Sequence, residues 1–172
     1  MTSAIQLALD VLPHFRTAVL KRHVYTYGHY ASAIGRDSAT ESMVVGKAMH
    51  AIGAACVLGA VPLAPLHFVE RADGEWRGVF ESDASERIHV LPEYNLLYMT
   101  ARDHHYSERD FERIHRSLAV AFPKHLNPNQ LSPHDLWHVV INAKRQDGST
   151  IFQQALVKYR ELAAQQRATR GT

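Results

Sequence analysis

The expected fold is built on two stretches of sequence, VYTYGHYASAIG at residues 24–35 and ESMVVGKAMHAIGAACVL at residues 41–58. The first predicts a short helix over residues 27–34, because Gly35 can end a helix in a left-handed conformation. The second predicts a longer and much more apolar helix, which Gly59 can terminate. Two helices separated by a turn predict a helix-turn-helix unit.

Segments on both sides of this unit extend the pattern. Apolar residues at helical spacing predict a first helix over residues 3–21, and a short β-prone stretch follows at 23–26. Further along, residues 66–71 resemble a strand, Asp73-Gly74 is a strong hairpin-turn signal, and 76–80 is the expected return strand. Three helices followed by a β-hairpin are typical of a winged helix-turn-helix, which is a mainly helical α+β fold with a hairpin wing.

The second half of the chain predicts a helical extension. Residues 94–100 fit either a strand or a turn of buried helix. Ser107 is a good N-cap for a helix that ends before Pro123, and Ser132 begins another candidate helix with proline in its first position. The last expected helix runs from residue 149 to about 167 and carries an apolar stripe.

The composition is that of one soluble globular unit, with 172 residues, 46% of them apolar and 21% charged. We expect a winged-helix domain at 1–82 and a mostly helical extension at 83–172, packed together. The net charge of +2 excludes a polybasic or acidic tail. The longest uncharged run, 51–66, is too short and too rich in proline and glycine to span a membrane. With the single cysteine, Cys56, and no signal-peptide pattern, this predicts a cytoplasmic protein.

Three short motifs carry a resemblance to a known family. They are Tyr27-Gly28 with Ala31 and Gly35, then Val45-Gly46-Lys47-Ala48-Met49, and finally Pro65-Leu66-His67-Phe68-Val69 before Asp73-Gly74. With them, residues 24–79 resemble the DNA-binding domain of the O6-alkylguanine alkyltransferases and their alkyltransferase-like relatives. They also look like a broader set of small bacterial winged-helix proteins with a TYG motif. The resemblance implies a winged helix that binds double-stranded DNA, with Tyr27 where the family has a tyrosine that helps to rotate a nucleotide.

The departures from the family pattern change the expected activity. Leu66 stands where the family has its alkyl-accepting cysteine, so there is no thiolate at this position to attack a carbon. Met43 stands where the family has the arginine that displaces a base, and Phe68 replaces the arginine of its Pro-Cys-His-Arg motif. We therefore expect a DNA-binding protein that is not an enzyme and needs no cofactor.

A winged helix contacts DNA through its second helix and its wing. Within 42–58, only Lys47 and His50 carry donors suited to bases or phosphates. The expected DNA contacts are Tyr27, Arg36, Lys47, His50, Arg71, Trp76 and Arg77. With Lys21 and Arg22, the cations of this set could cluster on one face, which would offset the low net charge.

Two other interpretations are compatible with the same sequence. The helix over 41–58 could simply be the core of the domain, with Tyr27 packed against the wing. The modest net charge of the chain also suits a protein-interaction module, such as an adaptor or inhibitor in a bacterial or phage defence setting. In that case the last helix, with its apolar stripe, would pair with a partner or with a second copy.

Twelve histidines in the chain raise a further alternative, a histidine-coordinated metal hydrolase or nuclease. His134 and His138 lie four residues apart on one expected helix face, as in zinc sites of the HExxH type. The third ligand would come from His104, His105, His115 or His125. Asp103-His104-His105, with Asn127, Asn129 and His134, also has some features of a metal-finger nuclease, although the helix expected between them spoils the spacing. No complete metal site is assigned.

Overall fold

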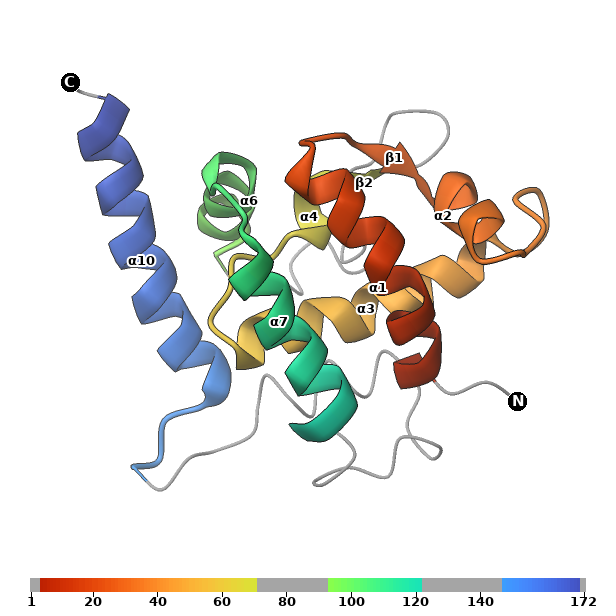
Figure 1. Cartoon of the computed structure of the whole chain (residues 1–172). Helices are drawn as coiled ribbons and strands as arrows, with labels where there is room; N and C mark the ends of the chain where they lie inside the picture. The colour runs from red at the N-terminus through yellow and green to blue at the C-terminus, as the bar shows by residue number, and fades with distance from the viewer. Residues whose placement is uncertain (1–3, 71–92, 122–146, 171–172) are drawn as a thin grey trace.

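The computed structural model describes residues 4–70, 93–121 and 147–170. This part of the chain is mainly helical and contains one small two-stranded sheet (Figure 1). The expected mainly helical α+β class is therefore confirmed.

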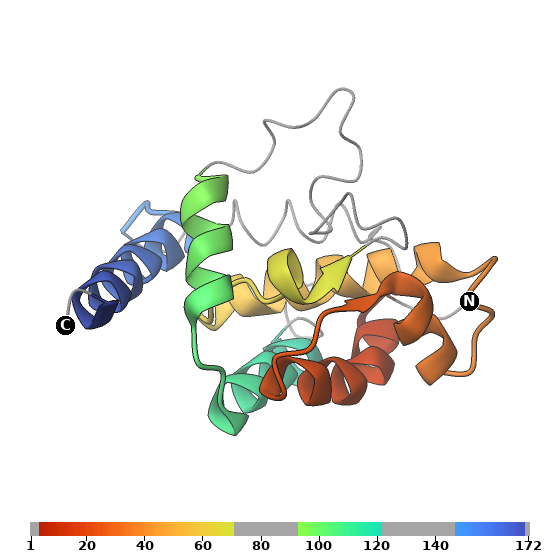
Figure 2. The same ribbon diagram turned by 90° about the horizontal axis from the view of Figure 1, so that it is seen from above.

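Three helices form the N-terminal part, as the sequence predicts. They are α1 (Ala4–Leu20), α2 (Tyr27–Ala33) and α3 (Ser42–Leu58). They pack pairwise against one another, with α1 lying across α3 (Figures 1 and 2). Each begins and ends within two residues of its expected bounds, because helical spacing and the glycines that follow α2 and α3 are local signals.

The region after α3 differs from the expected strand. Residues Pro65–Phe68 form a short helix, α4, and the strand β2 is confined to Val69–Glu70. Pro65 at the first helical position favours this turn, since its fixed φ suits a helix start and it lacks the N–H that would go unbonded there. Leu66 and Phe68 are both fully buried, so the short apolar run serves a helical turn in the core.

The sheet is parallel. β1 (Tyr25–Thr26) pairs with β2, with Tyr25 opposite Val69 and Thr26 opposite Glu70. The hairpin turn and the return strand at 76–80 lie outside the described residues, as do Arg71, Trp76 and Arg77. The wing of the expected winged helix therefore stays a prediction.

The later elements are α6 (Tyr94–Asp103), α7 (Glu108–Arg116), the π-helical turn η2 (Ser117–Ala121) and α10 (Ile151–Arg170). The ambiguous stretch at 94–100 is thus helical. Ser107 caps α7 as expected, and its side chain and that of Asp110 form a capping box. The helix expected from Ser132 lies outside the described ranges.

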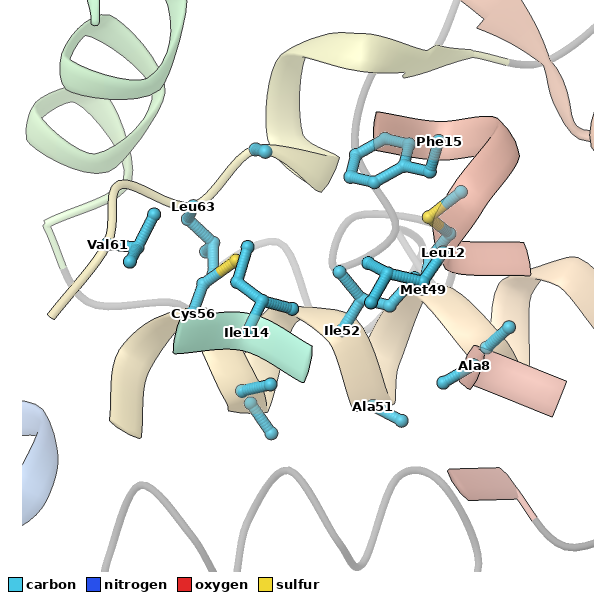
Figure 3. Close-up of a cluster of buried hydrophobic side chains, with 14 of the residues drawn as sticks. Ala8, Leu12, Phe15, Met49, Ala51, Ile52, Cys56, Val61, Leu63 and Ile114 are labelled. Carbon is cyan, nitrogen blue, oxygen red and sulfur yellow. The ribbon is translucent and has the colours of Figure 1, made fainter. Parts of the chain in front are cut away.

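A single hydrophobic cluster takes side chains from both halves of the chain. α1 and α3 contribute most of it, and Ile114 of α7 and Tyr159 of α10 belong to the same cluster. Figure 3 shows side chains of α1, α3 and α7 in this cluster. Two tyrosines fix the linker after α3: Tyr159 donates a hydrogen bond to the Val61 carbonyl at 2.6 Å, and Tyr106 donates to the Pro62 carbonyl at 2.8 Å.

Candidate nucleic-acid interface

The turn between α2 and α3 has a defined structure. Gly35 ends α2 with a positive φ of 78°, a conformation that a side chain would strain. Asp37 Oδ1 accepts a hydrogen bond from the Ala39 amide at 2.8 Å, and the Asp37 carbonyl accepts from the Glu41 amide at 2.8 Å. Residues 34–41 thus form an ordered connection, longer than the three or four residues of a compact helix-turn-helix.

Gly28 of the TYG motif holds this turn against α2. A Cβ atom at Gly28 would lie 3.3 Å from the Ser38 Cβ, tighter than ordinary packing allows. The Thr26 hydroxyl caps the same helix by accepting from the His29 amide at 3.1 Å. The start of α2 and the turn that precedes α3 are therefore in direct contact.

The structure describes four of the seven expected DNA-contacting residues. Lys47 is exposed on α3, and Tyr27 is half-buried against the hydrophobic core. The Arg36 guanidinium forms an ion pair with Glu41, at 2.8 Å between Nη1 and Oε2. His50 directs Nδ1 at the carbonyl of Gly46 one turn earlier, at 2.8 Å, so that nitrogen donates within its own helix. Lys47 is therefore the cation of this set that lies exposed without a recorded ion pair in the described region.

Most of α3 is core. Residues 51 to 57 are all buried, so the second half of the helix lies in the interior of the protein. The interpretation of this helix as the core of the domain thus fits the second half of α3. Among residues 44–58 only Lys47 is exposed, so the surface that α3 could offer to a ligand lies in the turns around Lys47.

The expected cluster of cations is smaller than the sequence suggests. Arg22 adopts a left-handed conformation with φ 59° and lies over the Phe68 ring, 5.5 Å from its centroid. Its guanidinium also donates to the carbonyls of Arg102 and His104. Arg22 thus joins the end of α1 to the α6–α7 turn and is not available to a phosphate.

Three aromatic side chains, His23, Tyr25 and His29, lie together beside the start of α2, an arrangement that is not predicted from the sequence. The rings of Tyr25 and His29 stack, with centroids 3.9 Å apart and planes within 8°. His23 Nδ1 lies 3.0 Å from the Tyr25 hydroxyl, and both histidines are exposed. The available signal was the i, i+4 spacing of Tyr25 and His29. An exposed ring such as that of His29 is the kind of surface on which unpaired bases stack.

The histidines considered as metal ligands have other partners where they are described. His104 Nε2 lies 3.0 Å from Asp110 Oδ2, and Asp103 pairs with Arg102 and Arg170. Burial raises the pKa of Asp110, but hydrogen bonds from His104 and Ser107 outweigh it and lower the pKa below its usual value. Among residues 4–70, 93–121 and 147–170, no three His, Cys, Asp or Glu side chains group to hold a metal. His125, His134 and His138, with Asn127 and Asn129, lie outside these ranges.

Leu66 and Cys56, the two positions considered for a nucleophile, are both buried. Leu66 is fully enclosed, and its neighbour His67 has Nδ1 3.3 Å from the Tyr98 hydroxyl. Burial raises the pKa of Cys56 to about 12, so its thiol is protonated at neutral pH. Neither position offers a nucleophile.

An open groove of about 670 Å³ lies between α1 and the α7–η2 segment. Its apolar lining comes from Leu9, Leu12, Pro13, Phe111 and Val120, and its charged lining from Arg16, Glu108, Glu112, His115 and Arg116. Arg16 and Glu108 form an ion pair across it.

Comparison with known proteins identifies no matching family model, no similar curated protein and no similar solved structure. Among the described helices, none is both long enough and apolar enough to cross a membrane.

Proposed function

We propose that this chain is a non-catalytic DNA-binding protein that uses a winged-helix domain over residues 1–82. The observation that carries the proposal is the α2–turn–α3 unit, in which the start of α3 is exposed at Lys47. Gly28 and Ser38 bring this turn beside the first turn of α2, where the Tyr25–His29 stack lies. An exposed cation in the second turn of α3 and the exposed His29 ring suit a duplex with one displaced nucleotide.

The proposal does not include alkyl transfer to a thiol. Leu66 is a core side chain, and the Cys56 thiol is buried with a pKa of about 12. The proposed wing residues Arg71, Trp76 and Arg77 extend the contact to the DNA backbone, which is the usual role of a wing.

Fluorescence anisotropy at low salt tests the proposal, with a plain duplex and a duplex carrying one extrahelical nucleotide. Lys47→Gln removes one phosphate contact, so the slope of log affinity against log salt should fall by about 0.9. Lys158→Gln on α10 is the matched control, because Lys158 is an exposed lysine paired with Glu161 and lies outside the proposed site. The wild type should prefer the extrahelical duplex, and His29→Ala should reduce that preference.

Failure of the wild type to bind either duplex at micromolar concentration would overturn the proposal. So would binding that is unchanged both in Lys47→Gln and in a variant combining Arg71→Ala with Arg77→Ala.

The α1–α7 groove favours a second candidate function, a protein-interaction module. The stripe on the last helix no longer supports it, because Phe152, Leu156 and Tyr159 of α10 pack into the chain's own core. Light scattering over a rising concentration series tests self-association. A mass that stays at 19.4 kDa throughout would exclude pairing of two copies.

A further inference from the structure

Three arginines form a line on the outer face of α7. Arg109, Arg113 and Arg116 are all exposed, and their i, i+4, i+7 spacing places them on one side of the helix. Across the described ranges, no carboxylate lies within ion-pair distance of any of the three, and we call them the α7 arginine stripe.

The acidic residues of α7 do not neutralise the stripe. Glu108 pairs with Arg16 of α1, and Asp110 accepts from His104 and from the Ser107 amide. Glu112 is the remaining carboxylate of the helix, and it lies beside the stripe without a recorded ion pair in the described part. The helix has no net charge in sequence, but its outer face is positive.

Helix stability does not explain the whole stripe. Cations in the last turn interact favourably with the helix dipole, which accounts for Arg113 and Arg116. Arg109 is the second residue of α7, where the positive end of the dipole disfavours a cation. Arg109 is thus unfavourable for the helix and has no ion-pair partner in the described ranges, and such a residue is a candidate for a functional contact.

The dimensions and chemistry of the stripe suit a phosphodiester backbone. With a rise of about 1.5 Å per residue, Arg109 and Arg116 are about 10.5 Å apart along the helix axis. One strand of a duplex carries a phosphate every 3.4 Å of its axis, so this length spans about three phosphates. All three cations are arginines, whose planar guanidinium donates two parallel hydrogen bonds to a phosphate.

We propose that the α7 arginine stripe is a second nucleic-acid contact, which binds the phosphate backbone of duplex DNA. The inference rests on the proposed DNA-binding function and adds phosphate contacts that the α3 site lacks, because Arg36 and Arg22 are already engaged.

The two contacts are held apart by α3 itself. Arg113 packs beside Gly59, where an added Cβ would lie 3.5 Å from the Arg113 Cβ, whereas Lys47 lies near the other end of α3. Positions 47 and 59 are about 18 Å apart along the axis of α3.

The test compares two triple variants with the same change in charge. In one, Arg109, Arg113 and Arg116 are all replaced by Gln. In the other, the exposed α10 cations Lys158, Arg160 and Arg167 are replaced by Gln. Anisotropy against a 20-base-pair duplex is measured across a salt series. The stripe variant should lower the log–log salt slope by about 2.7, three contacts at about 0.9 each, and the α10 variant should leave it near the wild-type value.

A gain-of-affinity variant complements this loss. Glu112→Gln removes the carboxylate beside the stripe and should tighten binding severalfold at low salt. Arg109→Gln alone should weaken binding without lowering the thermal midpoint, since it removes a cation from the positive end of the helix dipole. If the stripe only stabilised α7, Arg109→Gln would lower the thermal midpoint and leave binding unchanged.

The outcomes separate the two proposals. If the stripe variant binds like the α10 variant while Lys47→Gln is impaired, the inference fails and the α3 site stands. If Lys47→Gln binds like the wild type while the stripe variant is impaired, the α3 site fails as proposed and α7 remains the contact. A wild type that binds no duplex overturns both. Competition by poly-glutamate as strong as that by DNA of equal charge would assign the stripe to an acidic protein and overturn the inference.

Discussion

Asp110 has two partners at the start of α7. Its Oδ2 accepts from the Ser107 amide and lies against His104 Nε2, both at 3.0 Å, while the Ser107 hydroxyl accepts from the Asp110 amide at 3.3 Å. These hydrogen bonds outweigh burial and lower the pKa of Asp110. The histidine–aspartate pair, which the sequence offered as a fragment of a metal or nuclease site, therefore acts in this structure as a helix cap.

The lowered pKa predicts an acid-dependent loss of stability. A carboxylate whose folded pKa lies below its unfolded value of about 3.9 stabilises the fold above that pH, and this contribution is lost as the pH falls through the folded pKa. Asp103, whose pKa is lowered by hydrogen bonding to Arg102, acts in the same direction. Urea unfolding from pH 6 to pH 3 should show a smaller decline for Asp110→Asn than for the wild type. Glu161→Gln on α10 controls for loss of one surface carboxylate, and equal declines for Asp110→Asn and the wild type would contradict the assignment.

At the scale of elements, α10 shows how a helix with an ordinary apolar stripe is fixed in place. Tyr159 is fully buried and hydrogen-bonds the Val61 carbonyl, so it joins α10 to the linker that leaves α3. Near the other end, Gln166 donates to the Thr100 carbonyl of α6 at 3.3 Å and Arg170 pairs with Asp103. The same helix is thus tied to α6 and to the end of α3.

Tyr159→Phe should destabilise the protein although it removes one oxygen atom only. The Val61 carbonyl is buried, and losing its donor leaves it unsatisfied at a cost of about 1–3 kcal/mol. Urea titration followed by circular dichroism measures the change. Val157→Ala on the exposed side of α10 should change the free energy of unfolding by less than about 0.5 kcal/mol. A neutral Tyr159→Phe would mean that water or another donor replaces the hydroxyl.

At the scale of the whole molecule, the two parts expected from the sequence share their interior. Cys56 lies in the second half of α3, within the cluster to which Ile114 of α7 and Tyr159 of α10 also belong. Its position makes the thiol a reporter on the joint opening of both parts.

Labelling of Cys56 by a thiol reagent should therefore require global unfolding. With a pKa of about 12, the native thiol is almost entirely protonated at pH 8 as well as enclosed. The logarithm of the labelling rate should rise with urea at the slope measured for global unfolding by circular dichroism. A distinctly smaller slope would show that the C-terminal helices detach before the N-terminal core opens.

Sequence reasoning predicted the features that depend on neighbours along the chain. The bounds of α1, α2 and α3 follow from helical spacing and from glycines at 35 and 59, and the cap at Ser107 follows from a motif of four residues. The sequence predicts a strand at Leu66 to Phe68 where the structure has a helical turn, because an apolar run this short fits either and packing decides between them.

The order and type of the long helices can be predicted from the sequence, since their caps and periodicity act over a few residues. Which charges remain exposed depends on how the helices pack together. Arg36 is matched by Glu41 and Arg22 by backbone carbonyls of the α6–α7 turn, whereas Arg109, Arg113 and Arg116 stay exposed on α7. A charged side chain is available to a ligand only if folding does not bring a partner for it from elsewhere in the protein. Whether it finds such a partner depends on contacts between residues far apart in the chain.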